Sequence, residues 1–279
     1  MKNRDLLVKI VFVAVILLLL LSLVAPAIFA QTQPKQEKLL NELKVLMWPD
    51  AKAEKVTVRV RIHSGSAFDP QGKEGLMQML ADNLFPNQEI RDFFAEDLGG
   101  HLDVRCSYNY IQVEASAKPE FLLQMMETVA GAVSSRPIDK PTTITLRDAQ
   151  IEKVKQLEAD AAYIAERAVA KRLLGDFPYG RPTMGTVASL QKIDYADLVD
   201  ARQRFLTADN ATITLSGNFD RKYAFLAIRR LLGPWQKSDR KVPSTFRQPD
   251  DPPAAVMTIP SPKPDAWAMR MAMRGVARS

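Results

Sequence analysis

The sequence is poor in the residue types that most often carry chemistry. Its 279 residues include one cysteine, Cys106, and two histidines, His63 and His101. A single cysteine cannot form a disulfide within the chain, and in a strand-like context it is expected to be a small core residue. The two histidines lack the spacing of metal ligands toward each other, and we expect ordinary polar roles for both.

Several catalytic and nucleotide-binding signatures are also missing. The chain has no Gly-x-Ser-x-Gly elbow, no phosphate-binding loop, no dinucleotide fingerprint and no Cys–His pair at a suggestive spacing. The formal charge is +6, but no dense run of Lys and Arg occurs, so nucleic-acid binding is not expected. With 25% charged and 47% hydrophobic residues, the chain can bury one good-sized core or two small ones.

The clearest targeting pattern lies at the N-terminus. Basic residues precede an apolar run over residues 10–25, and small and then polar residues follow it. This order predicts a secretory signal peptide over residues 1–30, cleaved after Ala30 or, as second choice, after Ala27. The alternative is an uncleaved anchor through residues 10–25, because that run is near the lower limit for spanning a bilayer. In both cases we expect export to the periplasm or the extracellular space.

The rest of the chain predicts a polar linker at residues 31–42, an α+β module at 43–237 and a tail rich in Pro and charge at 238–279. Residues 56–62 alternate between apolar and polar, which indicates a strand with one buried face. Other strands are expected near 43–48, 101–106, 109–116, 211–216 and, in the tail, 254–259. Helices are expected at 74–85, 89–98, 146–157, 160–174, 195–205 and 221–232, and from Pro119, with a connection at 136–145. Because these elements come in mixed groups, we predict a mixed sheet with helices packed on one face.

Two stretches resemble the pitrilysin/insulinase family of zinc peptidases. The first is GKEGLMQMLADNLF at residues 72–85, which follows an Asp69-Pro70 turn. The second begins with PYGRP at 178–182 and continues with Gly185-Thr186, Leu190, Ile193, Asp197-Leu198, Phe205, Asn210-Ala211 and Ser216-Gly217-Asn218. With Gly99-Gly100, the resemblance covers about residues 40–235. It implies the fold of one half of the family's two-domain unit.

The family's zinc motif, His-x-x-Glu-His, is absent from the matching stretch. Residue by residue, Gln78 stands in place of the first His, Ala81 in place of the Glu and Asp82 in place of the second His. In the family, the imidazoles hold zinc and the Glu acts as general base on zinc-bound water. An amide is a poor zinc ligand and Ala81 has no proton acceptor. The resemblance therefore implies no catalytic residue and no bound zinc.

Weak metal candidates remain at Asp82 and Glu152. The family's third ligand comes from a later helix, where both Glu152 and Glu158 are available and the sequence does not distinguish them. The plainer alternative for both is a solvated helix face. A rearranged site that joins His63, His101 and Asp82 is the other alternative.

Only one of the family's two halves is recognised in this chain. Residues 256–278 look like the first strand of a second half, cut short, so the expectation is either a natural single module or a truncated reading frame. The family's substrate-holding Arg/Tyr pair belongs to the second half, and no residue is assigned to it here.

Three functions follow from the resemblance. The first is a catalytically inactive partner of a zinc-bearing subunit of the same family, which helps to form the peptide chamber. The second is a stand-alone peptide-binding or scaffold module that holds extended peptides at a sheet edge. The third is a divergent metal-dependent peptidase with a rearranged site. The expected partners are thus a zinc-bearing subunit and extended peptides, with membrane contact only through an uncleaved N-terminal segment.

Overall fold

The computed structural model describes residues 35–238 and 249–275. The predicted signal peptide therefore lies outside the described residues. The chain from Gln36 onward forms one compact unit. Within the described ranges, no helix combines the length and the apolar character that crossing a bilayer requires.

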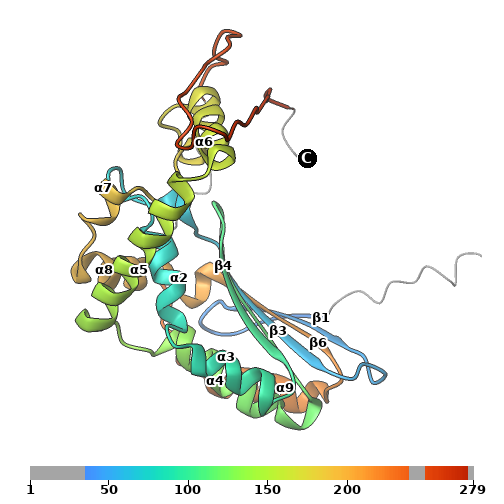
Figure 1. Cartoon of the computed structure of the whole chain (residues 1–279). Coiled ribbons are helices and arrows are strands. Elements are labelled where there is room, and N and C mark those ends of the chain that lie inside the picture. The colour runs from blue at the N-terminus through green and yellow to red at the C-terminus, as the bar shows by residue number, and fades with distance from the viewer. Residues whose placement is uncertain (1–34, 239–248, 276–279) are drawn as a thin grey trace, which may run out of the picture. The chain divides into compact units, whose positions relative to one another are not determined.

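The centre of the fold is a six-stranded mixed sheet with the strand order β1-β2-β6-β3-β5-β4 (Figure 1). Strands β2 and β6 run parallel, whereas β3 pairs antiparallel with both β6 and β5, and β5 pairs antiparallel with β4. In chain order the strands are β1 Lys35–Lys38, β2 Lys44–Pro49, β3 Val56–Ile62, β4 His101–Cys106, β5 Ile111–Ala117 and β6 Ala211–Gly217. The predicted mixed sheet is confirmed.

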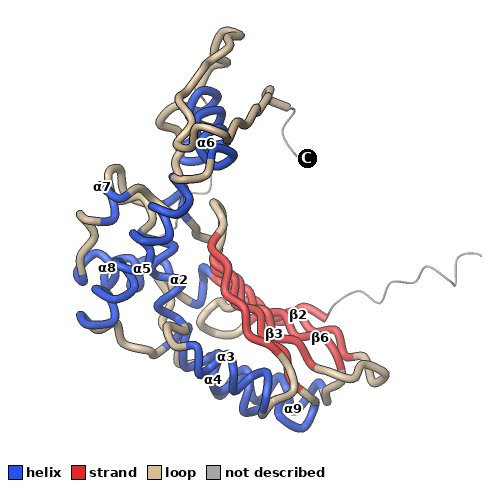
Figure 2. Tube along the Cα trace, viewed as in Figure 1, coloured by secondary structure: helices blue, strands red, loops and turns tan. Residues whose placement is uncertain are grey.

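Helices α3, α4 and α9 lie along one face of this sheet (Figures 1 and 2). On β3 the side chains of Val56, Val58, Val60 and Ile62 are buried against the helices, while those of Arg59 and Arg61 point to the other face and are exposed. The α-helices are α2 Leu76–Leu84, α3 Gln88–Glu96, α4 Leu122–Ser134, α5 Lys140–Glu158, α6 Ala161–Leu174, α7 Val187–Leu190, α8 Tyr195–Phe205 and α9 Arg221–Leu232. The prediction of helices on one face is therefore confirmed, and the side chains that β3 presents on the opposite face are polar.

Three local predictions need correction. The predicted linker at 31–42 contains the short strand β1. Helix α5 begins at Lys140, inside the predicted connection, because Asp139 caps it by accepting the N–H of Thr142 and Pro141 occupies the first turn, where a missing N–H costs nothing. Residues 254–259 form no strand, since no described strand pairs with them.

Cys106 packs at the margin of the core, as its sequence context predicts. It is partly buried at the end of β4 and lies against the hydrophobic core cluster. Burial raises the pKa of its thiol above the usual range. A thiol that resists ionisation is a weak nucleophile, so the cysteine is not part of the candidate site.

Candidate functional site

Helix α2, which carries the positions of the missing zinc motif, is held at its start by a buried carboxylate. Asp69 Oδ2 accepts the N–H of Gly75 at 2.9 Å, and Asp69 Oδ1 accepts the N–H of Met77 at 2.8 Å. These amides belong to the first turn, where a helix offers its N–H groups no partner of its own. Burial raises the pKa of Asp69 to about 7, although the two N–H donors oppose that rise. Asp69 thus fixes where α2 begins and how its faces are oriented.

The structure brings the two stretches that carry the family resemblance into direct contact. Gln150 of α5 donates from Nε2 to the carbonyl of Gly75 at 3.2 Å and to that of Met184 at 2.8 Å. Lys73 forms an ion pair with Asp197, with Nζ–O distances of 2.5 and 2.6 Å. These contacts place segment 69–85 against segment 181–198. The two stretches that resemble the family, although far apart in the sequence, therefore pack together as one unit.

Gly185 permits the closest approach between these segments. Its φ is +76°, and a Cβ built on it would lie 2.1 Å from the carbonyl oxygen of Glu74. We expect Gly185→Ala to lower the free energy of unfolding by about 3 kcal/mol, because it adds a backbone clash to the cost of a left-handed conformation. Chemical denaturation of the two proteins measures this difference.

Gly72 supplies the matched control for this substitution. Its φ is +81°, but a Cβ there would meet nothing within 4 Å. Gly72→Ala should therefore cost only the conformational part, about 1 kcal/mol. Equal losses in the two variants would contradict the close approach of Gly185 to Glu74.

The positions of the missing motif interact with each other. Gln78 Nε2 donates to Asp82 Oδ1 at 3.0 Å, which confirms that these two residues share a helix face. Burial raises the pKa of Asp82, while the bond from Gln78 and the charges of Lys153 and Arg91 lower it. Ala81 has no exposed surface. At the position of the general base there is thus a buried methyl group.

Neither glutamate of α5, Glu152 or Glu158, is among the described groups that act on the pKa of Asp82. Glu152 Oε1 pairs with Lys155 Nζ at 2.6 Å, and both side chains are more than half exposed. Glu158 lines a cavity near the end of the helix. The charged residue of α5 that acts on the pKa of Asp82 is Lys153, a cation. The plainer expectation, a solvated helix face, agrees with the environment of Glu152.

The rearranged site that joins both histidines is wrong. His63 follows the end of β3 and its Nε2 lies 2.8 Å from Thr212 Oγ1, while His101 begins β4 with its Nδ1 2.7 Å from Ser116 Oγ. Through β5, His101 is in register with Thr57 at the far end of β3. Six residues of strand then separate the histidines along the sheet, roughly 20 Å, too far for one metal ion.

The residues present do not fit a zinc ion. In the ranges that the structure describes, no group of three or more His, Cys, Asp or Glu side chains could hold a metal. A structural zinc site takes four such donors and a catalytic one takes three. Here the amide of Gln78 donates to Asp82, so that carboxylate has a partner within the helix. The absence of bound zinc stays a prediction.

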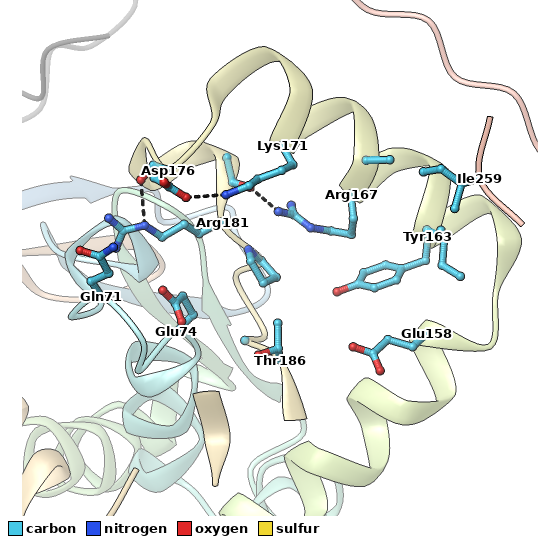
Figure 3. A pocket seen from close by; sticks show the side chains of 15 residues that line it. Gln71, Glu74, Glu158, Tyr163, Arg167, Lys171, Asp176, Arg181, Thr186 and Ile259 are labelled. Carbon is cyan, nitrogen blue, oxygen red and sulfur yellow. Dashed lines mark hydrogen bonds and ion pairs between the residues drawn. The ribbon is translucent and has the colours of Figure 1, made fainter. Parts of the chain in front are cut away.

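A cavity of about 520 Å³ lies where α6 faces the loops at 71–74 and 180–186 (Figure 3). Glu158, Tyr163 and Arg167 reach it from α5 and α6, and Glu74 and Arg181 reach it from the loops. Arg167 Nη2 donates to the carbonyl of Gly180 at 2.5 Å. Burial raises the pKa of Tyr163.

Sequence reasoning missed this cavity. Its lining comes from segments far apart in the chain, including Ile259 of the tail. Part of the lining, at residues 180–186, belongs to the second stretch that resembles the family, but that resemblance does not predict that the stretch lies beside α6 and encloses a cavity.

The fold and the altered helix α2 define the class of this protein: an α+β module of the metallopeptidase type. Residues 44–187, about half of the chain, match the sequence model of the family Insulinase (Peptidase family M16). The chain therefore belongs to the insulinase family, peptidase family M16.

Individual relatives are distant. The chain is 21% identical over 209 residues to a probable mitochondrial-processing peptidase subunit beta of Arabidopsis thaliana, which covers 73% of this chain and 39% of the relative. The structure is similar to the periplasmic protease PqqL of Escherichia coli, with a TM-score of 0.66, 20% identity and coverage of 77% of this chain and 26% of that one. It is also similar to a peptidase M16 inactive domain of Pseudomonas fluorescens, with a TM-score of 0.67, 16% identity and coverage of 76% and 53%. The chain thus spans between a quarter and about half of the length of these proteins.

Proposed function

We propose that this chain is a catalytically inactive, exported M16 module that acts as the partner of a zinc-bearing subunit of the same family in peptide processing. Its part would be to complete the chamber in which the peptide lies, while the partner supplies the zinc and the general base.

One observation carries the proposal. On α2, the two positions of the metal-binding imidazoles hold an amide and a carboxylate that bond to each other, and the position of the general base holds the buried Ala81. Zinc-assisted hydrolysis needs a metal with an open position and a base beside it. The start of α2 is nevertheless well held, since Asp69 accepts the N–H of Gly75 and Gln150 donates to the carbonyl of Gly75. A retained fold without the reactive groups is typical of a subunit that binds or positions.

Two of the similar proteins support this proposal by their names. One is called a subunit beta, and the other is called an inactive domain of an M16 peptidase. Export is supported by the N-terminal pattern, with a basic start, an apolar run and a small-residue stretch. The similarity to a periplasmic protease fits the same compartment.

The zinc content of the purified chain is the first test. After dialysis against a metal-free buffer, elemental analysis should find less than about 0.1 zinc per chain, because the donor set that zinc requires is incomplete. An active M16 subunit with an intact His-x-x-Glu-His motif, dialysed in parallel, is the positive control. A value close to one zinc per chain would contradict the proposal and would make Asp82 and Glu152 the first residues to replace.

The stand-alone peptide-binding module is the second candidate, and the edge strand β4 favours it. Among the described strands, β4 has a neighbour on one side only, so an extended peptide could add to its free side. Reconstitution separates the two candidates. A partner role requires that a zinc-bearing M16 subunit cleaves peptides faster with this chain than without it, and a stand-alone module leaves that rate unchanged.

A further inference from the structure

The sheet face opposite the helices is polar and carries more positive than negative side chains. Its cations are Lys44 on β2, Arg59 and Arg61 on β3, and Arg105 on β4, and each of these residues is exposed. Two carboxylates, Asp103 and Glu114, share this face. We call this surface the open face.

Both carboxylates of the open face are already paired. Arg59 binds Glu114 with two bonds, Nε–Oε2 at 2.8 Å and Nη2–Oε1 at 3.1 Å. Arg105 Nε lies 2.5 Å from Asp103 Oδ2. Among the described residues, Lys44 and Arg61 form no ion pair. The excess charge of the open face therefore resides on these two side chains.

Lys44 and Arg61 flank the same residue. In the sheet register, Thr212 of β6 is opposite Lys44 on one side and opposite Arg61 on the other. The guanidinium of Arg61 lies 4.3 Å from the centre of the Tyr110 ring and donates to Gln112 Oε1 at 2.7 Å, so its position is fixed. The pKa of His63 nearby is lowered, first by burial and then by the charges of Lys44 and Arg61. Lys44 and Arg61 thus create one region of positive potential that includes His63.

We infer that Lys44, Arg61 and Thr212 form a subsite for the carboxylate side chains of an extended acidic peptide lying on the open face. The inference rests on the proposed function, in which this module helps to form a peptide chamber, and it names the chemistry of the peptide. A carboxylate offers the acceptor atoms that a guanidinium, an ammonium and a hydroxyl can share.

The spacing of the subsite fits a peptide in extended conformation. Lys44 and Arg61 lie two strands apart, about 10 Å between backbones. In an extended peptide, side chains at positions i and i+2 project to the same side about 7 Å apart. The long side chains of Lys44 and Arg61 can bridge the difference between the distance of their backbones and the spacing of the peptide side chains. Alternate acidic residues are therefore the pattern that the open face should prefer.

A nucleic acid is a poorer occupant of the same surface. Strong binding of a nucleic acid commonly uses six to ten phosphate contacts. The open face offers two cations without an ion pair, which suits one or two carboxylates.

The test measures the binding of fluorescently labelled decapeptides to the full-length chain in mild detergent at about 0.1 M salt. Fluorescence anisotropy reports the binding. One peptide carries Glu at alternate positions, the second carries Gln there and the third carries Lys. We expect the Glu peptide to bind at least about tenfold more tightly than the other two. The Lys44→Gln/Arg61→Gln variant should remove that preference, while Arg61→Lys should retain most of it.

The control variant is Lys192→Gln/Lys222→Gln. It removes the same net charge from two exposed residues away from the sheet, so it should keep the preference. Three results would overturn the inference: equal binding of the three peptides, an equal loss in the control variant, or tighter binding of a single-stranded oligonucleotide or of anionic vesicles than of the Glu peptide. The partner and zinc experiments have separate readouts. A chain that stimulates a zinc-bearing subunit but fails this test retains its proposed function and loses only the acidic preference.

Discussion

The Asp69→Ala variant is expected to lose about 3 kcal/mol of unfolding free energy at pH 5. The substitution removes the acceptors of the N–H groups of Gly75 and Met77, both in a buried setting. A buried donor left without a partner costs about 1–3 kcal/mol, and loss of a helix cap costs about 0.5–2 kcal/mol. In a domain of this size, such a loss lowers the melting temperature by roughly 6–12 °C. Thermal unfolding followed by circular dichroism measures it.

The same carboxyl gives this effect a pH dependence with a definite sign. Its pKa is about 7 in the folded protein against an ordinary value of 3.8, so the folded state holds the proton more tightly than the unfolded state. The stabilisation from that proton is complete below about pH 4 and is lost as the pH rises through 7. The loss amounts to about 4 kcal/mol at most, at about 1.4 kcal/mol per pKa unit.

Asp69→Asn isolates this contribution because an amide does not titrate. Relative to Asp69→Asn, the native protein should lose its advantage between pH 4 and pH 8, and the deficit of Asp69→Ala should shrink over the same range. A stability difference between the native protein and Asp69→Asn that stays constant over this range would show that Asp69 is ionised throughout.

The elements that the sequence predicts well are those with strong local signals. The alternation over residues 56–62 predicts strand β3 because one face of that strand is buried. The helix predicted at residues 195–205 is α8, and its start is fixed by a capping box in which Asp194 and Asp197 each accept the other's backbone N–H. Local chemistry decides these elements, so no distant part of the chain is needed to predict them.

The elements that the sequence predicts poorly depend on distant partners. Strand β1 is polar and short, and it forms at the edge of the sheet beside β2. Residues 254–259 have strand-like composition but no strand beside them, so they stay without regular structure. The cavity beside α6 is a further case, because it is assembled from four segments. In each case a non-local contact, present or absent, decides the outcome.

For the candidate site, the sequence identifies the residues that replace the zinc motif but not what surrounds them in the fold. The spacing of Gln78 and Asp82 predicts a shared helix face, and the bond between them is as expected from that spacing. The electrostatic effect of Lys153 on the pKa of Asp82 depends on the packing of α5 on α2, which the sequence does not predict. That cation makes the site still less suited to a metal ion.

Restoring the general base alone should unfold much of the protein. Ala81 is fully buried, so Ala81→Glu would place a carboxylate in the core without a cation to pair with it. We expect a loss of more than about 4 kcal/mol at pH 7, since burying an unpaired charge is among the most damaging substitutions. Urea denaturation measures the loss, and it should diminish at low pH, where the new carboxyl is neutral.

Ala81→Met separates the effect of charge from that of size. An apolar side chain of similar length should cost only the overpacking, about 1–3 kcal/mol. If the Glu and Met variants are equally destabilised at pH 7, the carboxylate at position 81 reaches solvent or a cation. Burial would then not explain why a general base is not tolerated at this position.

The triple variant Gln78→His/Ala81→Glu/Asp82→His extends this argument to the metal. It restores two imidazoles one helical turn apart and removes the Gln78–Asp82 bond. We expect zinc to raise its melting temperature and to have no effect on Ala81→Glu alone, because metal binding stabilises only the state that holds the ligands. Adding Glu158→Ala or Glu152→Ala then identifies the third ligand by loss of the zinc effect. If zinc leaves the melting temperature of the triple variant unchanged, restoring the three motif residues is not enough to rebuild the site. The position of α5, with the cation Lys153, would then also prevent zinc binding.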